Sequence, residues 1–459
     1  MTLSHVFHPT ILREYDIRGI VNETLSDADA YAIGRAFGTM CAKLGGRHVA
    51  IGRDGRLSSP EMADAVSLGL QAAGIDVLDI GLGPTPMLYF AAKTLKADGG
   101  IMITGSHNPP SHNGFKMVMR GKPFFGADIQ ELGRIASCGA CATGSGSLTQ
   151  RPLGKAYVER LLQDYNGQRP LRVVWDCGNG ATGEIVTQLI SRLPGHHKVL
   201  FAEIDGRFPN HHPDPTDPHT LEALQAEVAA EGADLGVAFD GDGDRIGVVD
   251  GKGRILWGDQ ILVLLAEDVL KMRPGATIMA DVKASQALFD AIQGMGGEPL
   301  MWKTGHSLIK TKMAEIGCPL AGEMSGHIFF ADTYYGYDDA LYAAIRFLSK
   351  VARMPESLAA WHDRLPKMVN TPEIRIDCPD ERKFAVIEEV RTRLAASGAS
   401  VNATDGVRVK EAEGWWLLRA SNTQAVLVAR AEAGDDAGLG RLKSCLKAQL
   451  AASGLMAPL

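Results

Sequence analysis

Short apolar runs alternate with longer amphipathic stretches through most of the chain, which predicts strands that alternate with helices. A strand is expected at Arg47–Asp54, and the helix that follows it takes Ser59 as its cap. Met62, Val66 and Leu70 give that helix one apolar face. The same unit continues with strand Ile75–Ile80, helix Thr85–Leu95 and strand Gly99–Thr104.

This order of elements returns twice, so the chain contains three units of the form β-α-β-α-β. Each unit delivers a polar loop after its last strand. Parallel sheets bind ligands at the carboxyl ends of their strands, and the three loops are therefore expected to share one cleft. The later strands are expected at Leu171–Asp176, Lys198–Ile204, Asp234–Phe239, Ala276–Val282, Glu298–Lys303 and Pro319–Gly322.

The last part of the chain departs from this plan. After Pro366 and Pro372 come short strands, a helix at Glu381–Ser397, two more strands and a closing helix at Asp436–Ala452, an α+β order. The predicted fold is α/β, with three tandem repeats of a parallel-type mixed sheet unit and a C-terminal α+β domain, all four around one central cleft. The expected domains are residues 1–150, 151–256, 257–367 and 368–459.

Composition narrows the class of protein. A length of 459 residues, with 45% apolar and 22% charged residues, is typical of a globular chain with several domains. The net charge of −7 argues against a nucleic-acid partner. No apolar run of membrane-spanning length and no signal-peptide pattern occurs, so a cytoplasmic protein without a membrane partner is expected. The seven scattered cysteines fit a reducing compartment, and Cys138 and Cys141 are expected to be free thiols.

The loop of the first unit, Thr104-Gly-Ser-His-Asn-Pro-Pro110, carries the first chemical signal. It exposes the hydroxyl of Ser106 in a flexible turn, and the two prolines prevent the chain from continuing as strand or helix. The nucleophile elbow Gly-x-Ser-x-Gly is not met, because Asn108 stands where the second glycine would be.

The loop of the second unit, Asp240-Gly-Asp-Gly-Asp-Arg245, places three carboxylates at alternate positions, where they can point to one side. Carboxylate oxygens select hard cations. The calcium-hand pattern fails, because Arg245 replaces its glycine and Gly251 its closing glutamate. A Mg²⁺ site is therefore expected, and together with Ser106 it indicates metal-assisted phosphoryl transfer.

Three further loops carry weaker signals. Glu323, Ser325 and His327 alternate and can face one ligand, such as the hydroxyls of a sugar. Arg419–Gln424 combines a guanidinium, hydroxyls and an amide that suit a phosphate. The stretch Gly178–Gly183 fits a dinucleotide fingerprint, but a nicotinamide enzyme needs no metal loop, and a tight glycine turn is expected instead.

Together these residues resemble the α-D-phosphohexomutase superfamily, and within it the bacterial phosphomannomutase/phosphoglucomutase branch. The likeness runs along nearly the whole chain. Glu14–Gly19 is similar to the N-terminal motif of the family, and the four later loops are similar in order and spacing to its phosphoserine, metal-binding, sugar-binding and phosphate-binding loops. Thr104, Gly105 and Met324 differ from the phosphoglucosamine mutase branch, which usually has Ser, Ala and Gln there.

The resemblance implies an intramolecular phosphotransferase of the isomerase class. Such an enzyme interconverts hexose 1-phosphates and hexose 6-phosphates, here of mannose and glucose, with the preference between the two sugars left open. Ser106 would be carried as a phosphoserine, and a hexose 1,6-bisphosphate would be the intermediate and activator. The metal Mg²⁺ would be bound by Ser106, Asp240, Asp242 and Asp244.

The resemblance also implies roles for side chains. Arg18 and Arg245 would neutralise charge on the transferred group, and protons would be handled by Lys116, His306 or Lys283, which the sequence does not rank. The expected partners are small phosphosugars, and a monomer is expected. A phosphoserine-dependent phosphatase and a non-catalytic sugar-phosphate-binding protein stay open as alternatives. The substrate-binding residues implied by the resemblance are Tyr15, Lys283, His306, Glu323, Ser325, His327, Arg419, Ser421, Asn422 and Thr423.

Overall fold

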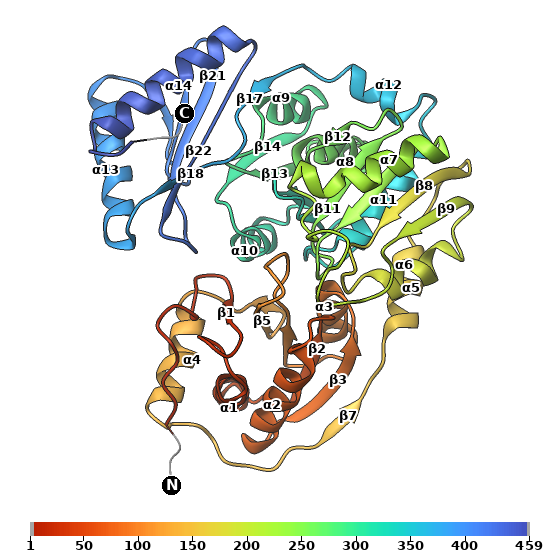
Figure 1. Cartoon of the computed structure of the whole chain (residues 1–459), viewed down its shortest axis with the longest axis vertical. Helices are drawn as coiled ribbons and strands as arrows, with labels where there is room; N and C mark the ends of the chain where they lie inside the picture. Colours follow the sequence, from red (N-terminus) through yellow and green to blue (C-terminus); the bar gives the residue numbers. More distant parts are fainter. Residues whose placement is uncertain (1–3, 457–459) are drawn as a thin grey trace.

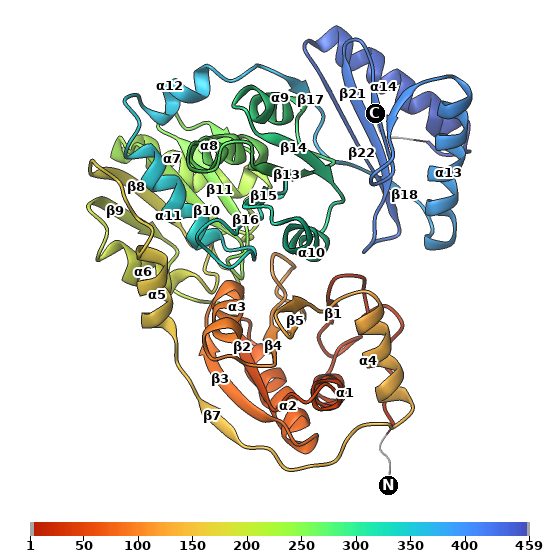
Figure 2. The same cartoon turned by 180° about the vertical axis from the view of Figure 1, so that it is seen from behind.

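The computed structural model describes residues 4–456 and contains four β-sheets, each with its own helices. In Figure 1 the first domain lies at the bottom, the second and third lie together at the upper right, and the C-terminal domain lies at the upper left. Figure 2 gives the same arrangement from behind. Among residues 4–456, no helix combines the length and the apolar character that a membrane crossing requires.

The first sheet has the strand order β1-β5-β4-β2-β3-β7, with β6 paired to β5. Its strands are β1 (Ile17–Ile20), β2 (His48–Arg53), β3 (Asp76–Leu82), β4 (Gly99–Ile103), β5 (His112–Met119), β6 (Lys122–Pro123) and β7 (Leu148–Gln150). Its helices are α1 (Asp27–Lys43), α2 (Ser59–Ala72), α3 (Thr85–Thr94) and α4 (Ala127–Ser137).

The second sheet has the order β12-β11-β10-β8-β9, and the third has the order β14-β13-β15-β16. The second contains β8 (Leu171–Asp176), β9 (Gly195–Leu200), β10 (Leu235–Phe239), β11 (Ile246–Asp250) and β12 (Ile255–Leu256), with α5 (Gly154–Leu162), α6 (Gly183–Ile190), the 3₁₀-helix η1 (Pro218–Leu221) and α7 (Glu222–Glu231). The third contains β13 (Thr277–Asp281), β14 (Glu298–Trp302), β15 (Leu320–Gly322) and β16 (Ile328–Phe330), with α8 (Gly258–Met272), α9 (Gln286–Gly294), α10 (His306–Ile316), α11 (Ala340–Val351) and α12 (Leu358–Asp363).

The C-terminal sheet is antiparallel in the order β17-β22-β21-β20-β19, with β18 paired to β22. Four strands lie between the two long helices, so the prediction of two was wrong. The missed pair is short, with three and four residues, which leaves little length for a pattern to mark either strand. The elements are β17 (Val369–Asn370), β18 (Ile374–Asp377), α13 (Asp380–Ala396), β19 (Ser400–Asn402), β20 (Val407–Lys410), β21 (Gly414–Ala420), β22 (Val426–Ala433) and α14 (Asp436–Ala451).

The three predicted repeats are confirmed as mixed sheets with one common strand order. Each has three parallel strands and a fourth that returns antiparallel, as β5-β4-β2-β3, β11-β10-β8-β9 and β16-β15-β13-β14. The three polar loops therefore occupy equivalent places, between the third strand and the returning fourth. All residues of β4, β10 and β15 are buried, which fits central strands covered on both faces.

Two local predictions were wrong. The second strand of the second repeat is β9, which begins three residues earlier than expected and ends before Phe201, whose φ is 52°. Helix α2 begins at Ser59 itself, flanked by Ser58, and neither serine caps it with its side chain. The Ser59 hydroxyl instead donates to Asp54 Oδ1 at 2.5 Å.

Candidate active site

A cleft of about 650 Å³ lies where the three equivalent loops meet the C-terminal domain. Eight of its lining residues are Lys or Arg and four are Asp or Glu, so the cleft is cationic although the whole chain has a net charge of −7. This charge suits an anionic ligand. Among the lining residues are Tyr15, Arg18, Ser106, Lys116, Arg245, Lys283, His306, Glu323, Ser325, His327, Arg419, Ser421, Asn422 and Thr423.

Ser106 lies at the floor of the cleft in the left-handed conformation, with a φ of 50°. The sequence predicts an exposed hydroxyl, but the residue is only 2% exposed, because the second domain covers it. Its Oγ donates to Asp240 Oδ2 at 2.9 Å. The close approach requires Gly241, since a Cβ there would come within 2.5 Å of the Ser106 carbonyl oxygen.

The three alternating carboxylates Asp240, Asp242 and Asp244 lie just beneath the cleft and are fully buried. They come close enough for one oxygen of each to reach a single ion. Burial and the neighbouring carboxylates raise the pKa of Asp240 well above its usual value, so the cluster favours a positive charge in its centre.

This cluster fits a hard cation. The Oδ1 atoms of Asp242 and Asp244 have no hydrogen-bond partner among residues 4–456. Buried carboxylate oxygens without partners are costly, and a divalent ion would satisfy both. The Ser106 hydroxyl beside Asp240 offers a fourth oxygen.

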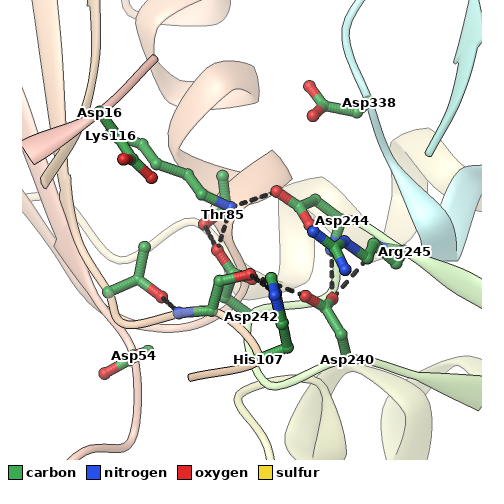
Figure 3. A network of polar contacts seen from close by, with 12 residues as sticks. Asp16, Asp54, Thr85, His107, Lys116, Asp240, Asp242, Asp244, Arg245 and Asp338 are labelled. Carbon is green, nitrogen blue, oxygen red and sulfur yellow. Dashed lines mark hydrogen bonds and ion pairs between the residues drawn. The ribbon is translucent and has the colours of Figure 1, made fainter. Parts of the chain in front are cut away.

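Lys116 projects from β5 of the first domain toward the carboxylates of the second (Figure 3). Its Nζ donates to Asp242 Oδ2 at 2.7 Å and also contacts Asp244. Burial alone would lower the pKa of Lys116, but the charges of Asp242 and Asp244 raise it above its usual value. In this arrangement Lys116 is an ammonium that can donate a proton.

A second polar group joins His306 and His327 through Asp338, which the sequence analysis missed. Asp338 Oδ2 lies 3.2 Å from His327 Nδ1 and 3.6 Å from His306 Nδ1, and Oδ1 accepts from Lys310 Nζ at 2.8 Å. Burial and the charge of Lys310 hold the pKa of His306 well below its usual value, so its ring is neutral. The sequence did offer one signal for Asp338. Two adjacent aspartates precede α11, and only the second, Asp339, caps the helix, which leaves Asp338 for another role.

The two predicted arginines reach the cleft from different domains. Arg18 donates from Nη1 to the side-chain oxygen of Asn108 at 3.2 Å, and it also pairs with Asp16. Arg245 donates from Nε to His327 Nε2 at 3.1 Å. Burial alone would lower the pKa of Arg245, but the carboxylates around it, Asp214 first among them, raise it.

Two cationic side chains that were predicted to bind phosphate or substrate already have carboxylate partners, which the sequence analysis missed. Arg419 donates from Nε to Asp405 at 2.8 Å, and Lys283 donates to Glu373 at 3.1 Å. Glu373 lies 90 positions from Lys283 and Asp405 lies 14 positions from Arg419, so no pattern within one element pairs them. An incoming phosphate would have to compete with both carboxylates.

The remaining predicted residues connect the domains. Tyr15 of the first domain donates to the Thr304 carbonyl at 3.0 Å and accepts from Asn422 of the C-terminal domain. Glu323 Oε1 accepts from Gly305 N at 2.7 Å, and burial raises the pKa of Glu323. Ser325 lines the cleft beside it.

Two other sequence signals have structural explanations. The Gly178–Gly183 turn packs behind the metal loop, where Ala181 N donates to the Gly241 carbonyl at 2.9 Å. That turn supports the carboxylate cluster, as expected of a tight glycine turn. Cys138 and Cys141 are free thiols, as predicted.

Known protein families match most of the chain. Residues 9–138, 155–253 and 257–369 match alpha/beta/alpha domains I, II and III of the family described as phosphoglucomutase/phosphomannomutase. Residues 373–448 match the C-terminal domain of the same family.

Several relatives are similar over nearly their full length. The chain is 46% identical to a phosphomannomutase/phosphoglucomutase of Pseudomonas aeruginosa over 96% of each chain. It is 43% identical to a phosphoglucomutase of Neisseria gonorrhoeae, over 95% of this chain and 96% of the relative. A solved phosphoglucomutase/phosphomannomutase family protein of Burkholderia thailandensis superposes with a TM-score of 0.94 at 45% identity, covering 99% of this chain and 100% of the other.

Proposed function

The chain belongs to the phosphoglucomutase/phosphomannomutase family, and on this premise we propose that it interconverts the 1-phosphates and 6-phosphates of glucose and of mannose. The proposed reaction is an intramolecular phosphotransfer of the isomerase class. One observation carries the proposal: the Ser106 hydroxyl of one domain lies 2.9 Å from Asp240 in the carboxylate cluster of another. A phosphoryl carrier beside a cation site at the floor of a cationic cleft is what metal-assisted phosphoryl transfer needs.

In the proposed mechanism Ser106 carries the phosphoryl group. A free hydroxyl of the bound hexose monophosphate attacks in line, the bond from phosphorus to Ser106 Oγ breaks, and a hexose 1,6-bisphosphate forms. Mg²⁺ bound by Ser106, Asp240, Asp242 and Asp244 would supply charge neutralisation at the transferred group. Arg18 and Arg245 add positive charge around the same group.

The protonation states of two side chains support a division of the proton transfers. Lys116 is an ammonium, so it can return a proton to the leaving Ser106 Oγ. His306 is a neutral imidazole, so it can accept the proton of the attacking sugar hydroxyl. Lys283 is the less favoured acceptor, because Glu373 and Asp281 raise its pKa against the effect of burial.

The bisphosphate must then turn end over end so that its other phosphate returns to Ser106. We propose that Glu323 and Ser325 hold the O3 and O4 hydroxyls in both orientations, because a turn about the axis between C3 and C4 roughly exchanges these two groups. The phosphate away from Ser106 would be held by Arg419, Ser421, Asn422 and Thr423, and the site would be completed by Tyr15, Lys283 and His327.

A hexose 1,6-bisphosphate acts as activator, by rephosphorylating Ser106 after its loss. We propose that the protein acts as a monomer in the cytoplasm; the seven free cysteines support the reducing compartment only. The four domains span residues 1–150, 151–256, 257–367 and 368–459, which the separate sheets support.

The proposal is tested by incubating the protein with glucose 1-phosphate, Mg²⁺ and a trace of glucose 1,6-bisphosphate. We expect glucose 6-phosphate to form, mannose 1-phosphate to give mannose 6-phosphate, and chelation of the metal to stop both reactions. Release of inorganic phosphate in place of isomer would indicate a phosphatase. Absence of product with both sugars would contradict the proposal.

The matched variant is Ser106→Ala, which removes the proposed phosphoryl carrier. We expect turnover to fall by several orders of magnitude, roughly 10⁴-fold or more, as for other lost covalent nucleophiles. After incubation with glucose 1,6-bisphosphate, intact-mass measurement should show one added phosphate on the wild type and none on the variant. Equal activity of the two proteins would exclude Ser106 as the carrier.

A further inference from the structure

Beneath the Ser106 loop lies a fully buried guanidinium that plays no part in the mechanism above. Arg56 lies between β2 and α2 and is 1% exposed. All five of its N–H groups are used. Nη2 donates to the carbonyls of Ser106 at 2.7 Å and Asn108 at 2.6 Å, Nη1 donates to those of Pro109 at 2.6 Å and His112 at 2.9 Å, and Nε donates to Asp54 Oδ2 at 3.1 Å.

Asp54 holds both the guanidinium and the loop. Its Oδ2 accepts from Gly105 N at 3.1 Å, in addition to Arg56 Nε. Its Oδ1 accepts from Arg56 N at 3.0 Å and from the Ser59 hydroxyl. The backbone N–H before Ser106 and the carbonyl of Ser106 itself are therefore tied to one buried ion pair. The conformation of the loop is therefore held by this ion pair as well as by its two prolines.

Burying a charged side chain to hold a turn costs desolvation free energy. Burial lowers the pKa of Arg56 against the opposing charge of Asp54, which shows how far the group is removed from water. Loops of similar size usually satisfy their carbonyls with backbone N–H groups or with water. The four carbonyls here converge on one guanidinium and need a donor with several N–H groups in a fixed fork, which among side chains only arginine supplies.

The conformation that this pair holds is the one the chemistry needs. Ser106 has a positive φ of 50°, a conformation that residues other than glycine adopt infrequently. In this conformation Oγ faces Asp240 at 2.9 Å, while the Ser106 carbonyl points away toward Arg56. Figure 3 shows Asp54 on the first domain, apart from the carboxylate cluster. Neither Arg56 nor Asp54 lines the cleft.

We propose that Arg56, held by Asp54, is a positioning residue that fixes the Ser106 backbone so that Oγ stays in line with the cation site and the substrate. This inference rests on the proposed mutase function. Arg56 touches neither the substrate nor the transferred group, so its loss lowers kcat through misplacement of Ser106. Substrate binding by the other three loops remains, and KM changes little.

The test compares Arg56→Lys and Arg56→Met with the wild type. Misplacement of a reacting group by about 1 Å costs on the order of a hundredfold, so Arg56→Met should lower kcat by about that factor with KM within about threefold. Arg56→Lys should recover part of the loss, because an ammonium has three donors but no fixed fork. The ³¹P resonance of phosphoserine 106, formed with glucose 1,6-bisphosphate, should shift or broaden in both variants.

The matched control is Arg35→Met. Arg35 donates to the Ala142 carbonyl at 2.7 Å in the same domain, outside the residues that line the cleft. The Arg35→Met variant should have a lower thermal midpoint, with kcat and the ³¹P resonance unchanged. If the Arg56 variants do not fold, Asp54→Asn replaces them, since it keeps the side-chain shape and removes the charge that anchors the guanidinium. We expect it too to lower kcat and to leave KM nearly unchanged.

The outcomes separate this inference from the proposed function. A wild type that converts sugar phosphates, together with folded Arg56 or Asp54 variants that keep kcat within about threefold, would overturn the positioning role alone. A rise in KM at unchanged kcat would also overturn it, because Arg56 would then act on binding. A wild type with no mutase activity would overturn both.

Discussion

At the scale of single residues, burial sets the protonation state of the groups that are proposed to face the sugar. Glu323 is 3% exposed, and burial raises its pKa, while Gly305 N holds one of its oxygens. A buried carboxyl with a fixed orientation suits a pair of adjacent hydroxyls. Glucose and mannose share equatorial O3 and O4 and differ only at C2, so a contact to O3 and O4 is common to both.

This reasoning predicts similar efficiencies for the two epimers. We expect kcat/KM for glucose 1-phosphate and mannose 1-phosphate to lie within about tenfold, or ~1.4 kcal/mol in transition-state binding. Glu323→Ala should weaken both reactions by a similar factor. Steady-state kinetics with both substrates check this. A variant that loses one epimer and spares the other would show that C2 is read directly.

A second residue-scale prediction concerns stability and pH. His211 Nε2 lies 3.0 Å from Asp176 Oδ2, and although burial alone would lower the pKa of His211, this carboxylate raises it above its usual value. A raised histidine pKa contributes stability that is fully present below about pH 6.5 and is lost as pH rises through the folded pKa. His211→Gln should therefore lower the thermal midpoint by about 1–2 °C more at pH 6 than at pH 9.

The matched variants for this pair are Asp176→Asn and His8→Gln. Asp176→Asn removes the carboxylate and should give the same pH-dependent loss as His211→Gln. His8→Gln is a control at an exposed histidine whose side-chain partner is the Thr10 hydroxyl. A midpoint difference that is independent of pH for His211→Gln would contradict the assigned pair.

At the scale of elements, the repeated strand order explains why three distant loops meet. The same turn from a third parallel strand into a fourth antiparallel strand carries Ser106 after β4, the three carboxylates after β10 and Glu323 after β15. Packing the three sheets brings these equivalent ends together. The C-terminal domain joins through the segment between α12 and β17, and the short connector between β17 and β18 of its own sheet carries Glu373.

The connector makes a prediction of its own. The charge of Lys283 lowers the pKa of Glu373 to about 2, so both side chains are ionised. Glu373 therefore pairs with a lysine that is proposed to bind substrate. Glu373→Gln should free Lys283 and tighten glucose 6-phosphate binding by roughly threefold to tenfold, about 1 kcal/mol, as expected of a partly exposed ion pair. Titration calorimetry measures the change.

The control for the connector is Glu389→Gln, a half-buried glutamate of the same domain that pairs with Arg382. It should leave the affinity unchanged. Weaker binding by Glu373→Gln would mean that Glu373 positions Lys283 for the phosphate instead of competing with it.

At the scale of the whole molecule, the hydrophobic cores divide the chain unequally. One core runs through the second and third domains and reaches α3 of the first. The C-terminal domain has its own core and meets the third domain through a small cluster of Val282, Trp415 and Leu417. In Figures 1 and 2 the C-terminal domain lies beside the third domain, and a single segment of chain connects them. Small interfaces of this kind permit relative domain motion.

This division predicts closure on substrate. If Arg419 clamps the distant phosphate, the C-terminal domain should swing inward, and small-angle scattering should give a smaller radius of gyration with saturating glucose 1-phosphate. Ser106→Ala serves for this measurement because it prevents turnover. An unchanged radius in Ser106→Ala and in the wild type would contradict closure and leave the phosphotransfer chemistry standing.

The sequence by itself determined the order of the elements, the threefold repeat and the loops that carry the chemistry. These properties are local. Apolar spacing distinguishes strand from helix, and glycine and proline mark the turns. Three alternating aspartates indicate a cation site whatever the surrounding fold. The later strands and helices were therefore expected within a few residues of their observed bounds, with β9 and the extra C-terminal strands as the exceptions.

Only the tertiary structure decided which residues meet. The returning strands β5, β11 and β16 follow their loops without a distinct period, because a strand that is buried on both faces shows no alternation. Lys116 pairs with carboxylates more than a hundred positions away, and Asp338 and Arg56 gain their roles from partners on other segments. Such pairings depend on the packing of sheets, and burial then sets the charge of Lys116 and His306, which no local pattern contains.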